Sequence, residues 1–542
     1  MCIQRNKQKL AHTCYSTIKT SLFLFLLVIN TGCGGGGGAP ISAVNVTQVV
    51  TTVLKATTVN TDSAISVSFD TNMDPATINK DTYLLSGPNG VISGSISYDS
   101  ATRTALFLPN APLLPQTTYT ATLTFGIKSA NGQMLSGENA WNLRTGKDSL
   151  ERTALDSIPA TLFGMHMHYA DTTTTWPAAT FGIWRLWDAW VGWPWLEPNK
   201  GEWNFAKLDQ YVAMAESKNV GIVLPLGLTP TWASARPTEF SPYHIPGAAA
   251  EPANIADWKN YVRTVATRYK GRIHYYELWN EVNIKDFYSG SPEQMVVLAR
   301  EMQSILKEID PSVTIISPSC TGIGLAWFDQ YIAKGGADYA DIIGYHFYVS
   351  PNAPESMLDL INKVKSILSK YNYSSKKIWN TEAGWYIQNS TNTVSPGVGS
   401  FSKVISSEEA SAYIARSYVL NWASGIDNFS WYAWDNSNMG LLESDNMTEK
   451  TAASAYVQTY KWLVGAKMIS CGKNSQGIWV SQIVDANNLK KWIIWNADSS
   501  ANFQFPEEWR VTKQVNLSGA VINMSGTSST TVGPAPIMLV GD

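Results

Sequence analysis

The sequence predicts a protein of three folded domains, in which a (β/α)8 barrel lies between an N-terminal β-sandwich and a small C-terminal β-sandwich. The 542 residues give room for two to four domains of ordinary size. Residues 46–147 and 466–542 contain runs in which apolar and polar side chains alternate, as they do in half-buried strands. Residues 148–465 instead alternate short apolar runs with helical stretches, which is typical of a parallel sheet built from βα units.

The composition excludes two classes of protein. Hydrophobic residues make up 44% of the chain and charged residues 15%, so the chain is not disordered as a whole. The formal net charge is -3, which leaves no basic excess to hold a nucleic-acid backbone, so no nucleic-acid partner is expected. The chain also has 22 tryptophans. A tryptophan ring needs either burial or a flat ligand such as a sugar ring, and composition leaves both explanations open.

The N-terminus has the pattern of a targeting segment. Basic residues precede the apolar run 22–29, which is too short to span a bilayer as a helix. The Gly32-Cys33 pair that follows resembles the processing site of bacterial lipoproteins, in which the cysteine is lipidated and becomes the first residue. This resemblance predicts a lipoprotein signal peptide at 1–32, a lipid-anchored Cys33, a glycine-rich tether at 33–45 and a location in the bacterial cell envelope, on the outer membrane. Ordinary signal-peptide cleavage that leaves a free cysteine is the alternative.

The later cysteines do not indicate a metal site. Cys320 and Cys471 lie far apart in the sequence, and neither belongs to a CxxC motif. The two could form one disulfide in an oxidising compartment, and the sequence leaves that pairing open. We therefore expect neither a metal nor a cofactor.

The first folded segment, 46–147, predicts a β-sandwich. Ile65, Val67 and Phe69 alternate with polar residues, and a helical period is not evident. The stretches that resemble bacterial immunoglobulin-like domains are 68–78, 98–107 and 114–121. Such modules mostly serve as spacers, so the resemblance implies an immunoglobulin-like fold and little chemistry.

Eight strand-like runs with helices between them predict the barrel over 148–465. The residues from Ser291 to Gln294 form a capping box with proline at the first helical position, and a second capping pattern begins at Ser406. Eight strands, each followed by a helix, match one (β/α)8 barrel. The predicted strands are 162–168, 182–187, 221–226, 273–279, 314–317, 342–348, 377–381 and 428–434. After this segment, the apolar runs 478–480 and 492–495 return to strand patterns and predict the C-terminal β-sandwich.

Two glutamates follow strands on opposite sides of the predicted barrel. Catalytic groups of such barrels lie at the carboxyl ends of the strands, where Glu281 follows the fourth strand and Glu382 the seventh. Two facing carboxylates are what glycoside hydrolysis requires. We expect Glu281 to be the general acid/base, with a raised pKa, and Glu382 to be an ionised nucleophile. Their carboxyl groups should lie about 5–5.5 Å apart, as in retaining enzymes.

The Asn280-Glu281 pair together with Glu382 resembles the clan A glycoside hydrolases, which are retaining barrel enzymes. The stretch from about 160 to 465 is similar to glycoside hydrolase family 39 and to relatives that act on bacterial exopolysaccharides. The resemblance implies that the fold is a TIM barrel and that the substrate is a glycan.

The resemblance also implies binding residues around the two glutamates. Arg185 would hydrogen-bond the nucleophile, His346 and Tyr348 would lie near it, and Trp434 would lie under the sugar. The Tyr348 hydroxyl would help to keep the nucleophile ionised. Asn280 would bind the sugar 2-OH, a contact that tightens in the transition state. A purely structural ion pair for Arg185 and a core position for His346 are the alternatives.

Two further groups of residues are candidates for sugar binding. His166 and His168 lie two positions apart on the first strand, and we expect only one of them, His168, to point into the cleft. This expectation argues against a metal site on the pair. Tryptophans cluster after strands two and three and near the catalytic strand ends. We expect two to four of them to face sugar, Trp232 among them, while packing of the loops is the alternative.

These observations favour a membrane-anchored, monomeric, retaining enzyme that hydrolyses β-linked bonds of a polysaccharide. An exo-acting enzyme of the β-xylosidase type is an alternative within the enzymes. A catalytically inactive barrel that binds glycans at the cell surface is an alternative from another class. Endo and exo action, and hydrolysis and transglycosylation, are all compatible with the sequence.

Overall fold

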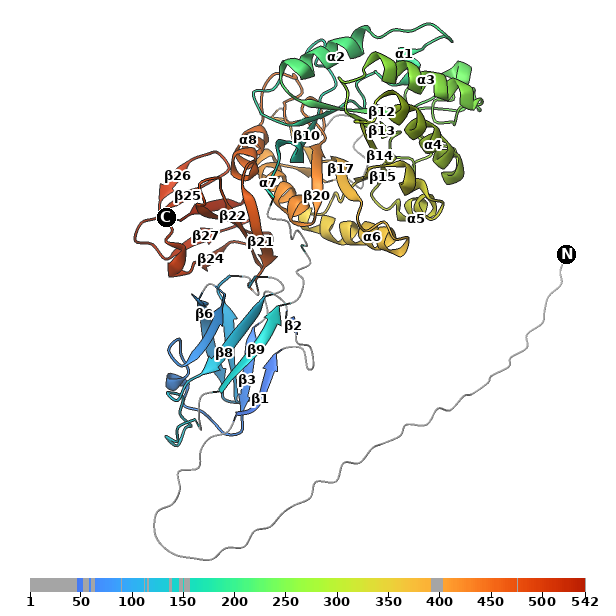
Figure 1. Cartoon of the computed structure of the whole chain (residues 1–542). Helices are drawn as coiled ribbons and strands as arrows, with labels where there is room; N and C mark the ends of the chain where they lie inside the picture. The colour runs from blue at the N-terminus through green and yellow to red at the C-terminus, as the bar shows by residue number, and fades with distance from the viewer. Residues whose placement is uncertain are drawn as a thin grey trace, which may run out of the picture. The chain divides into compact units, whose positions relative to one another are not determined.

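Figure 1 shows the computed structural model of the chain, in which three segments of regular structure follow one another. The predicted signal peptide, tether and Cys33 lie outside the described residues. Among the helices of the described residues, none has both the length and the hydropathy of a membrane span. The structure describes residues 46–541 except 52–57, 60–63, 89, 112, 115–116, 136–138, 146–149, 151–155, 391–402 and 475.

The N-terminal domain is a sandwich of two β-sheets, as predicted. One sheet has the strand order β1-β3-β7-β6 and the other the order β2-β9-β8-β4-β5. Alternate residues of β3, namely Ile65, Val67 and Phe69, are buried in the core between the sheets because successive side chains of a strand point to opposite faces. The strands are β1 (Val46–Thr51), β2 (Thr58–Val59), β3 (Ile65–Phe69), β4 (Tyr83–Gly87), β5 (Gly90–Val91), β6 (Gly94–Asp99), β7 (Thr104–Pro109), β8 (Thr118–Leu123) and β9 (Asn139–Thr145).

In the described residues of the central domain, eight parallel strands form a closed barrel, which confirms the predicted fold class. The pairing of β14 with β16 closes the ring, and the short strand β15 (Cys320–Thr321) pairs with β16 beyond it. The eight strands are β10 (Phe163–His166), β11 (Ile183–Arg185), β12 (Gly221–Leu226), β13 (Tyr275–Leu278), β14 (Thr314–Ile316), β16 (Ile342–His346), β17 (Lys377–Ala383) and β20 (Ile426–Trp431).

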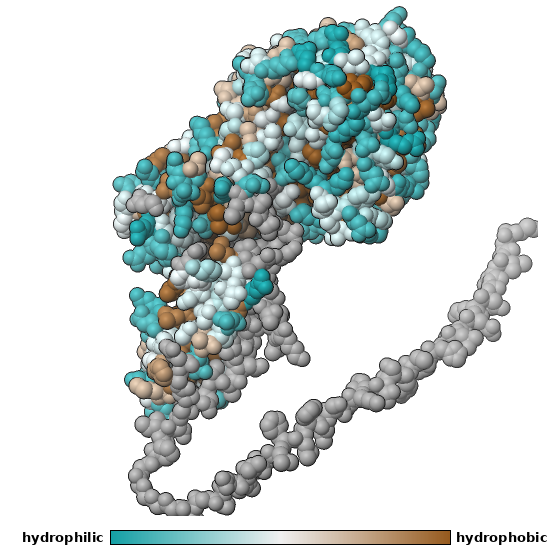
Figure 2. Space-filling view, viewed as in Figure 1, coloured by the Kyte–Doolittle hydropathy of each residue, from teal (hydrophilic) through white to brown (hydrophobic). Residues whose placement is uncertain are grey.

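Helices surround the barrel (Figure 1). In α4 the Ser291 hydroxyl accepts from the Gln294 N–H, the Gln294 side chain accepts from the Ser291 N–H, and Met295 and Leu298 begin the buried stripe. On the face shown in Figure 2, the barrel exposes mainly hydrophilic side chains, as expected of helices that turn their apolar stripes inward. The helices are α1 (Trp193–Leu196), α2 (Ala206–Ser217), α3 (Ile255–Arg268), α4 (Pro292–Ile309), α5 (Leu325–Ala333), α6 (Met357–Lys370), α7 (Ser407–Ala423) and α8 (Thr451–Leu463).

The first strand departs from the predicted pattern, because no helix follows β10. Residues 167–182, all of which the structure describes, form a loop. The Asp435 carboxylate holds the start of this loop, since it accepts hydrogen bonds from the backbone N–H groups of His168 and Tyr169 and from the Thr174 hydroxyl. Hydrogen bonds to the side chain of a distant residue thus take the place of the backbone hydrogen bonds that a helix would form.

The C-terminal domain is built from antiparallel strands, as predicted. One sheet has the order β21-β22-β23-β28-β25-β26, and β24 pairs with β27. Its apolar core includes the Trp492 and Trp509 rings, which stack with centroids 4.2 Å apart. The strands are β21 (Lys467–Lys473), β22 (Ile478–Val484), β23 (Lys490–Asn496), β24 (Ala501–Gln504), β25 (Lys513–Val515), β26 (Val521–Asn523), β27 (Ser529–Val532) and β28 (Ile537–Val540). Cys320, in the barrel, is a buried free thiol. The disulfide with Cys471, which the sequence left undecided, is therefore not formed.

Candidate active site

Glu281 and Glu382 meet at the mouth of the barrel. Glu382 lies near the end of β17, and Glu281 follows β13 in a short turn. Trp279 and Glu281 have positive φ angles of 59° and 44°, a costly backbone conformation that persists only where surrounding contacts require it and that often occurs at functional sites. One carboxylate oxygen of each glutamate and a ring nitrogen of His346 lie within 4.8 Å of one another. This spacing fits the roughly 5–5.5 Å of retaining enzymes and is shorter than the roughly 6.5–9.5 Å of inverting ones.

Arg185, the last residue of β11, joins three of the polar residues at this mouth. Its Nη1 donates to Glu382 Oε2 at 2.8 Å, its Nη2 to Asn280 Oδ1 at 2.8 Å and its Nε to Glu277 Oε2 at 2.5 Å. The Arg185 side chain has no exposed surface. The contact with Glu382 is the one that the family resemblance implied. The bond to Asn280 fixes the amide oxygen, which leaves the amide nitrogen of Asn280 as the donor available to a ligand.

Glu277 is a residue of this network that the sequence analysis did not single out. It lies on β13 with 0% exposure, and its Oε1 accepts from the Ser319 hydroxyl at 2.6 Å. A carboxylate inside an apolar strand is costly unless it is paired, and Arg185 provides the pair. The signal in the sequence was this single acidic residue in the apolar run before Glu281.

Two side chains from β16 and the loop after it complete the contacts of the glutamates. His346 Nδ1 lies 3.1 Å from Glu281 Oε1 and 3.8 Å from Glu382 Oε1. The Tyr348 hydroxyl donates to Glu382 Oε1 at 3.0 Å. Burial, with the neighbouring Glu382 charge, raises the pKa of Tyr348 well above 10, so the hydroxyl keeps its proton at neutral pH. Burial lowers the pKa of His346 to about 4, so this ring is neutral there.

Both glutamates have raised pKa values. Burial raises the pKa of Glu281 to about 7, as expected for a general acid. Burial also raises the pKa of Glu382 to about 7, although the charge of Arg185 opposes that rise. From the sequence, Glu382 was expected to be ionised because of its hydrogen-bond donors, but burial has the larger effect on its pKa. The pair therefore titrates as a coupled unit near neutral pH, and the contacts rather than the two values distinguish the roles.

The same groups could hold a cation. Glu281, His346 and Glu382 form the one cluster with metal-ligand spacing in the described residues. Arg185 already places a positive charge on Glu382, which disfavours a second one at the same carboxylate.

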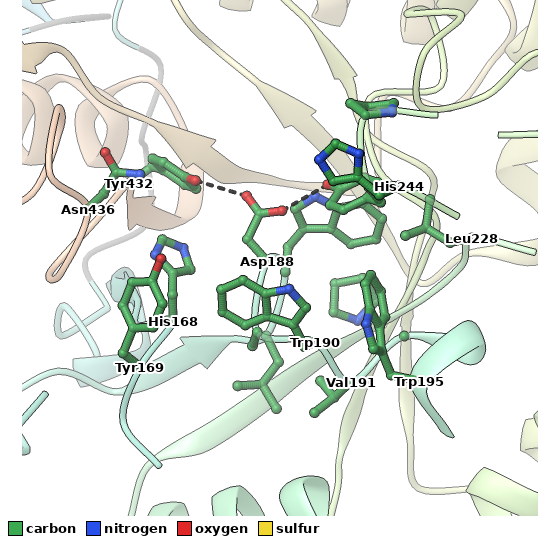
Figure 3. Close-up of a pocket in the computed structure, with 17 residues that line it drawn as sticks. His168, Tyr169, Asp188, Trp190, Val191, Trp195, Leu228, His244, Tyr432 and Asn436 are labelled. Atoms are coloured by element: carbon green, nitrogen blue, oxygen red, sulfur yellow. Dashed lines mark hydrogen bonds between the residues drawn. The ribbon is translucent and has the colours of Figure 1, made fainter. Parts of the chain in front are cut away.

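Two cavities open beside the glutamates. The glutamate cavity, of about 390 Å³, is lined by Trp187, Asp188, Asn280, Glu281, Phe287, Tyr348, Ser350, Glu382, Gly384, Tyr386, Tyr432 and Met439. The aromatic cavity, of about 350 Å³, shares Trp187, Asp188 and Tyr432 with it and is shown in Figure 3. Both volumes lie in the range of small-molecule sites. Asp188 and Tyr432 were not predicted from the sequence. The feature that could have indicated Asp188 is its position as an acidic residue within a tryptophan-rich stretch.

Trp434 and Trp232 do not line either of these cavities. Strand β20 ends at Trp431, and Trp434 is 2% exposed and packs in the core. Tyr432 takes the position at the cavities that was expected for Trp434. Trp232 is half-buried, its Nε1 donates to the backbone oxygen of Glu197, and its ring packs edge-on against Trp193. The tryptophans that do line the cavities are Trp187, Trp190 and Trp195.

The expectation that His166 and His168 point apart is wrong. Their ring centroids are 6.3 Å apart, and both rings lie against Tyr432. His166 ends β10 and His168 lies in the loop just after it, and two positions along an extended chain return to the same face. His168 lines the aromatic cavity, as expected, whereas His166 Nε2 lies 3.1 Å from the backbone oxygen of Thr381 inside the barrel.

Comparison with known families places two matches on the chain. Residues 42–145 match the model of the bacterial Ig-like domain, and residues 189–294 match the model of glycosyl hydrolase family 10. The second match begins at the residue after Asp188 and includes β13 and Glu281.

The solved structures with a similar fold include three glycoside hydrolases. A family 39 glycoside hydrolase from Bacteroides cellulosilyticus WH2 is 18% identical with a TM-score of 0.55, and the alignment covers 88% of this chain and 97% of that one. A GH39 β-xylosidase from Caulobacter crescentus is 13% identical with a TM-score of 0.53, over 72% of this chain and 98% of that one. A glucosidase from Croceicoccus marinus is 14% identical with a TM-score of 0.50, over 71% and 96%. These structures show the shared fold, and the matched hydrolase segment supports a glycosidase, which in clan A is of the retaining kind.

Proposed function

We propose that the protein is a retaining glycoside hydrolase that cleaves β-glycosidic bonds in a polysaccharide by double displacement. The observation that carries the proposal is the unequal bonding of two close carboxylates. Glu382 accepts hydrogen bonds from Arg185 and Tyr348, which stabilise its charged form, and Glu281 accepts neither of these bonds. This inequality supports Glu382 as the nucleophile and Glu281 as the acid/base.

The reaction follows from these roles. Glu382 attacks the anomeric carbon while Glu281 gives its proton to the leaving glycosidic oxygen, which forms a covalent glycosyl-enzyme. Glu281 then takes a proton from a water molecule, and the water attacks the anomeric carbon and breaks its bond to Glu382. The carboxylate of Glu382 is thereby restored, and the sugar leaves with its original configuration. With both pKa values at about 7, the pair holds about one proton near neutral pH, as this cycle requires.

A polymer at the cell surface is the proposed substrate, namely a bacterial exopolysaccharide or a cell-surface glycan. Two adjoining cavities support the binding of more than one sugar unit. The immunoglobulin-like segment and the lipid anchor expected at Cys33 support a tethered enzyme on the outer membrane. Replacement of Cys33 by serine should release the protein from the membrane fraction, and retention of this variant in that fraction would contradict the anchor.

The test of the activity is digestion of a panel of bacterial and plant polysaccharides, with product sizes and anomers read by NMR. Because two similar structures are described as a β-xylosidase and a glucosidase, the panel includes xylans and β-glucans. Glu281→Gln and Glu382→Gln should each lower the rate more than about a hundredfold. Glu308→Gln, at an exposed position bonded to Arg263, is the matched control and should keep the wild-type rate.

Each other outcome has a distinct meaning. Unchanged hydrolysis in both glutamine variants would show that the chemistry lies elsewhere. Products of inverted configuration would exclude double displacement. Binding of a glycan that the wild type never cleaves would support the glycan-binding alternative, and release of single terminal sugars would support exo action.

A further inference from the structure

The aromatic cavity continues the glutamate cavity and has polar and aromatic groups suited to a second sugar. The two cavities meet at Trp187, Asp188 and Tyr432. The aromatic cavity is also lined by His168, Tyr169, Trp190, Trp195, Tyr243 and Asn436. Figure 3 shows Asp188 between the labelled rings of this cavity, on the side of Tyr432.

Asp188 is held in place at the junction by two tyrosines. Its Oδ1 accepts from the Tyr243 hydroxyl at 2.8 Å and its Oδ2 from the Tyr432 hydroxyl at 2.9 Å, the two dashed lines of Figure 3. Its backbone has a φ of 55°, a strained conformation of the kind found at ligand sites. Each carboxylate oxygen can accept a further hydrogen bond, so the half-buried Asp188 can receive a donor from a ligand.

Trp190 provides a flat apolar surface in the same cavity. It also has a positive φ, of 54°, and the residue is 37% exposed although it lines a cavity. Its ring lies 5.4 Å from that of Tyr169, and the Lys207 ammonium lies 5.5 Å from its centroid. A large, partly exposed aromatic ring held next to polar acceptors suits the apolar face of a sugar.

The charges around the two cavities select against acidic sugars. Their lining includes the carboxylates of Asp188, Glu281 and Glu382 and, among the described residues, no lysine or arginine. Arg185 lies behind Glu382 and is already paired with Glu277. Lys207, whose ammonium lies 5.5 Å from the Trp190 ring, is already paired with Asp171, and His168 is already paired with Asp435. A sugar carboxylate would therefore meet like charges without an unpaired cation, which is unfavourable in a partly buried site.

We propose that the aromatic cavity binds a second, non-anionic sugar of the same polymer, next to the sugar that is cleaved. A hydroxyl or ammonium group of this sugar donates to Asp188, and its flat face packs on Trp190. A uronic acid is rejected at this position. This inference rests on the proposed function for the identity of the polymer as a substrate, but the binding that it describes does not require cleavage.

The test measures binding to the full chain carrying Glu382→Gln, so that hydrolysis does not interfere. The probes share one β-1,4-linked backbone, and they are cello-oligosaccharides, chitosan oligosaccharides and glucuronan oligosaccharides of two to six units, titrated by calorimetry. The neutral or amino series should bind at least about tenfold more tightly than the glucuronan series. Asp188→Asn keeps the shape of the side chain but removes its charge, so it should reduce this preference severalfold.

Trp190→Ala should weaken binding of chains of three or more units about tenfold, since a stacking surface is lost. Trp203→Ala is the matched control, because Trp203 stacks on Phe205 and lines neither cavity. Glucuronan binding as tight as that of the others, equal losses in the two tryptophan variants, or no binding by any series would overturn the proposal. If the binding pattern holds while the wild type cleaves no glycan, the proposed hydrolase function fails and this binding site stands.

Discussion

Arg185 and Glu277 form an ion pair without exposed surface, in which Nε of the arginine lies 2.5 Å from Oε2 of the glutamate. Because Glu277 holds one edge of the guanidinium, the opposite edge is aimed at Glu382 and Asn280. The pair therefore connects the barrel interior to the orientation of the proposed nucleophile.

Glu277→Gln should destabilise the fold and impair catalysis together. Removal of one partner of a buried ion pair typically costs about 3–5 kcal/mol, because the other charge remains buried. The free energy of unfolding, measured with urea, should fall by about this amount, and kcat should fall because Arg185 is no longer held. Glu216→Gln, which breaks an exposed pair with Arg272, should cost less than about 1 kcal/mol. Similar losses in the two variants would contradict a positioning role for Glu277.

The pH profile should change in a defined direction when Glu281 is replaced. The charge of Glu281 contributes to the raised pKa of Glu382, so Glu281→Gln should lower that pKa from about 7. With an activated aryl glycoside, which needs little acid assistance, the acid limb of kcat/KM should therefore move to lower pH and the basic limb should disappear. An acid limb that stays in place, or a basic limb that persists, would argue against the assigned roles.

Tyr348→Phe should shift the same limb in the opposite direction. The substitution removes the hydrogen bond to Glu382 Oε1, which favours the charged form, so the pKa of Glu382 should rise. A hydrogen bond to a charged group contributes about 1.5–3 kcal/mol. Its loss should therefore lower kcat/KM at neutral pH roughly tenfold to a hundredfold. Tyr373→Phe removes an exposed bond to Asp338 and serves as the control. An unchanged pH profile in Tyr348→Phe would show that the hydroxyl does not act on the nucleophile.

Asp435→Asn should destabilise the loop after β10 in a pH-dependent way. Burial alone would lower the pKa of His168, but the bond to Asp435 outweighs it and raises that pKa above 6.5. Burial alone would raise the pKa of Asp435, but the bonds from His168 and Thr174 lower it below 3.8. The raised histidine stabilises below pH 6.5 and loses this effect as pH rises through its folded pKa. The depressed aspartate stabilises above pH 3.8 and loses its effect as pH falls through its folded pKa.

The loss of melting temperature in Asp435→Asn should therefore be largest between about pH 4 and 6.5 and smaller near pH 9. Asp445→Asn makes the same change in an exposed turn and should have little effect. A loss that does not vary with pH would show that the backbone hydrogen bonds, rather than the charge pair, hold the loop.

Local sequence patterns were enough to predict the two β-rich segments, the eight barrel strands and the pair Glu281 and Glu382. These features depend on local patterns. The spacing of apolar residues indicates where a strand lies, and residues at the carboxyl end of a barrel strand lie at the mouth of the barrel. The sequence pattern did not predict that β10 is followed by a loop instead of a helix, because Asp435, which holds this loop, lies far along the chain.

Which side chains line the two cavities depends on the tertiary structure. Tyr432 rather than Trp434 reaches them because β20 ends at Trp431, and Asp188 reaches them because its φ of 55° turns it to Tyr243 and Tyr432. Past the end of a strand, the direction of a side chain depends on loop backbone angles and on partners from distant elements. The sequence pattern of one strand contains neither the loop angles nor the distant partners. The two glutamates could therefore be located from the sequence, whereas the residues that line the cavities around them required the fold.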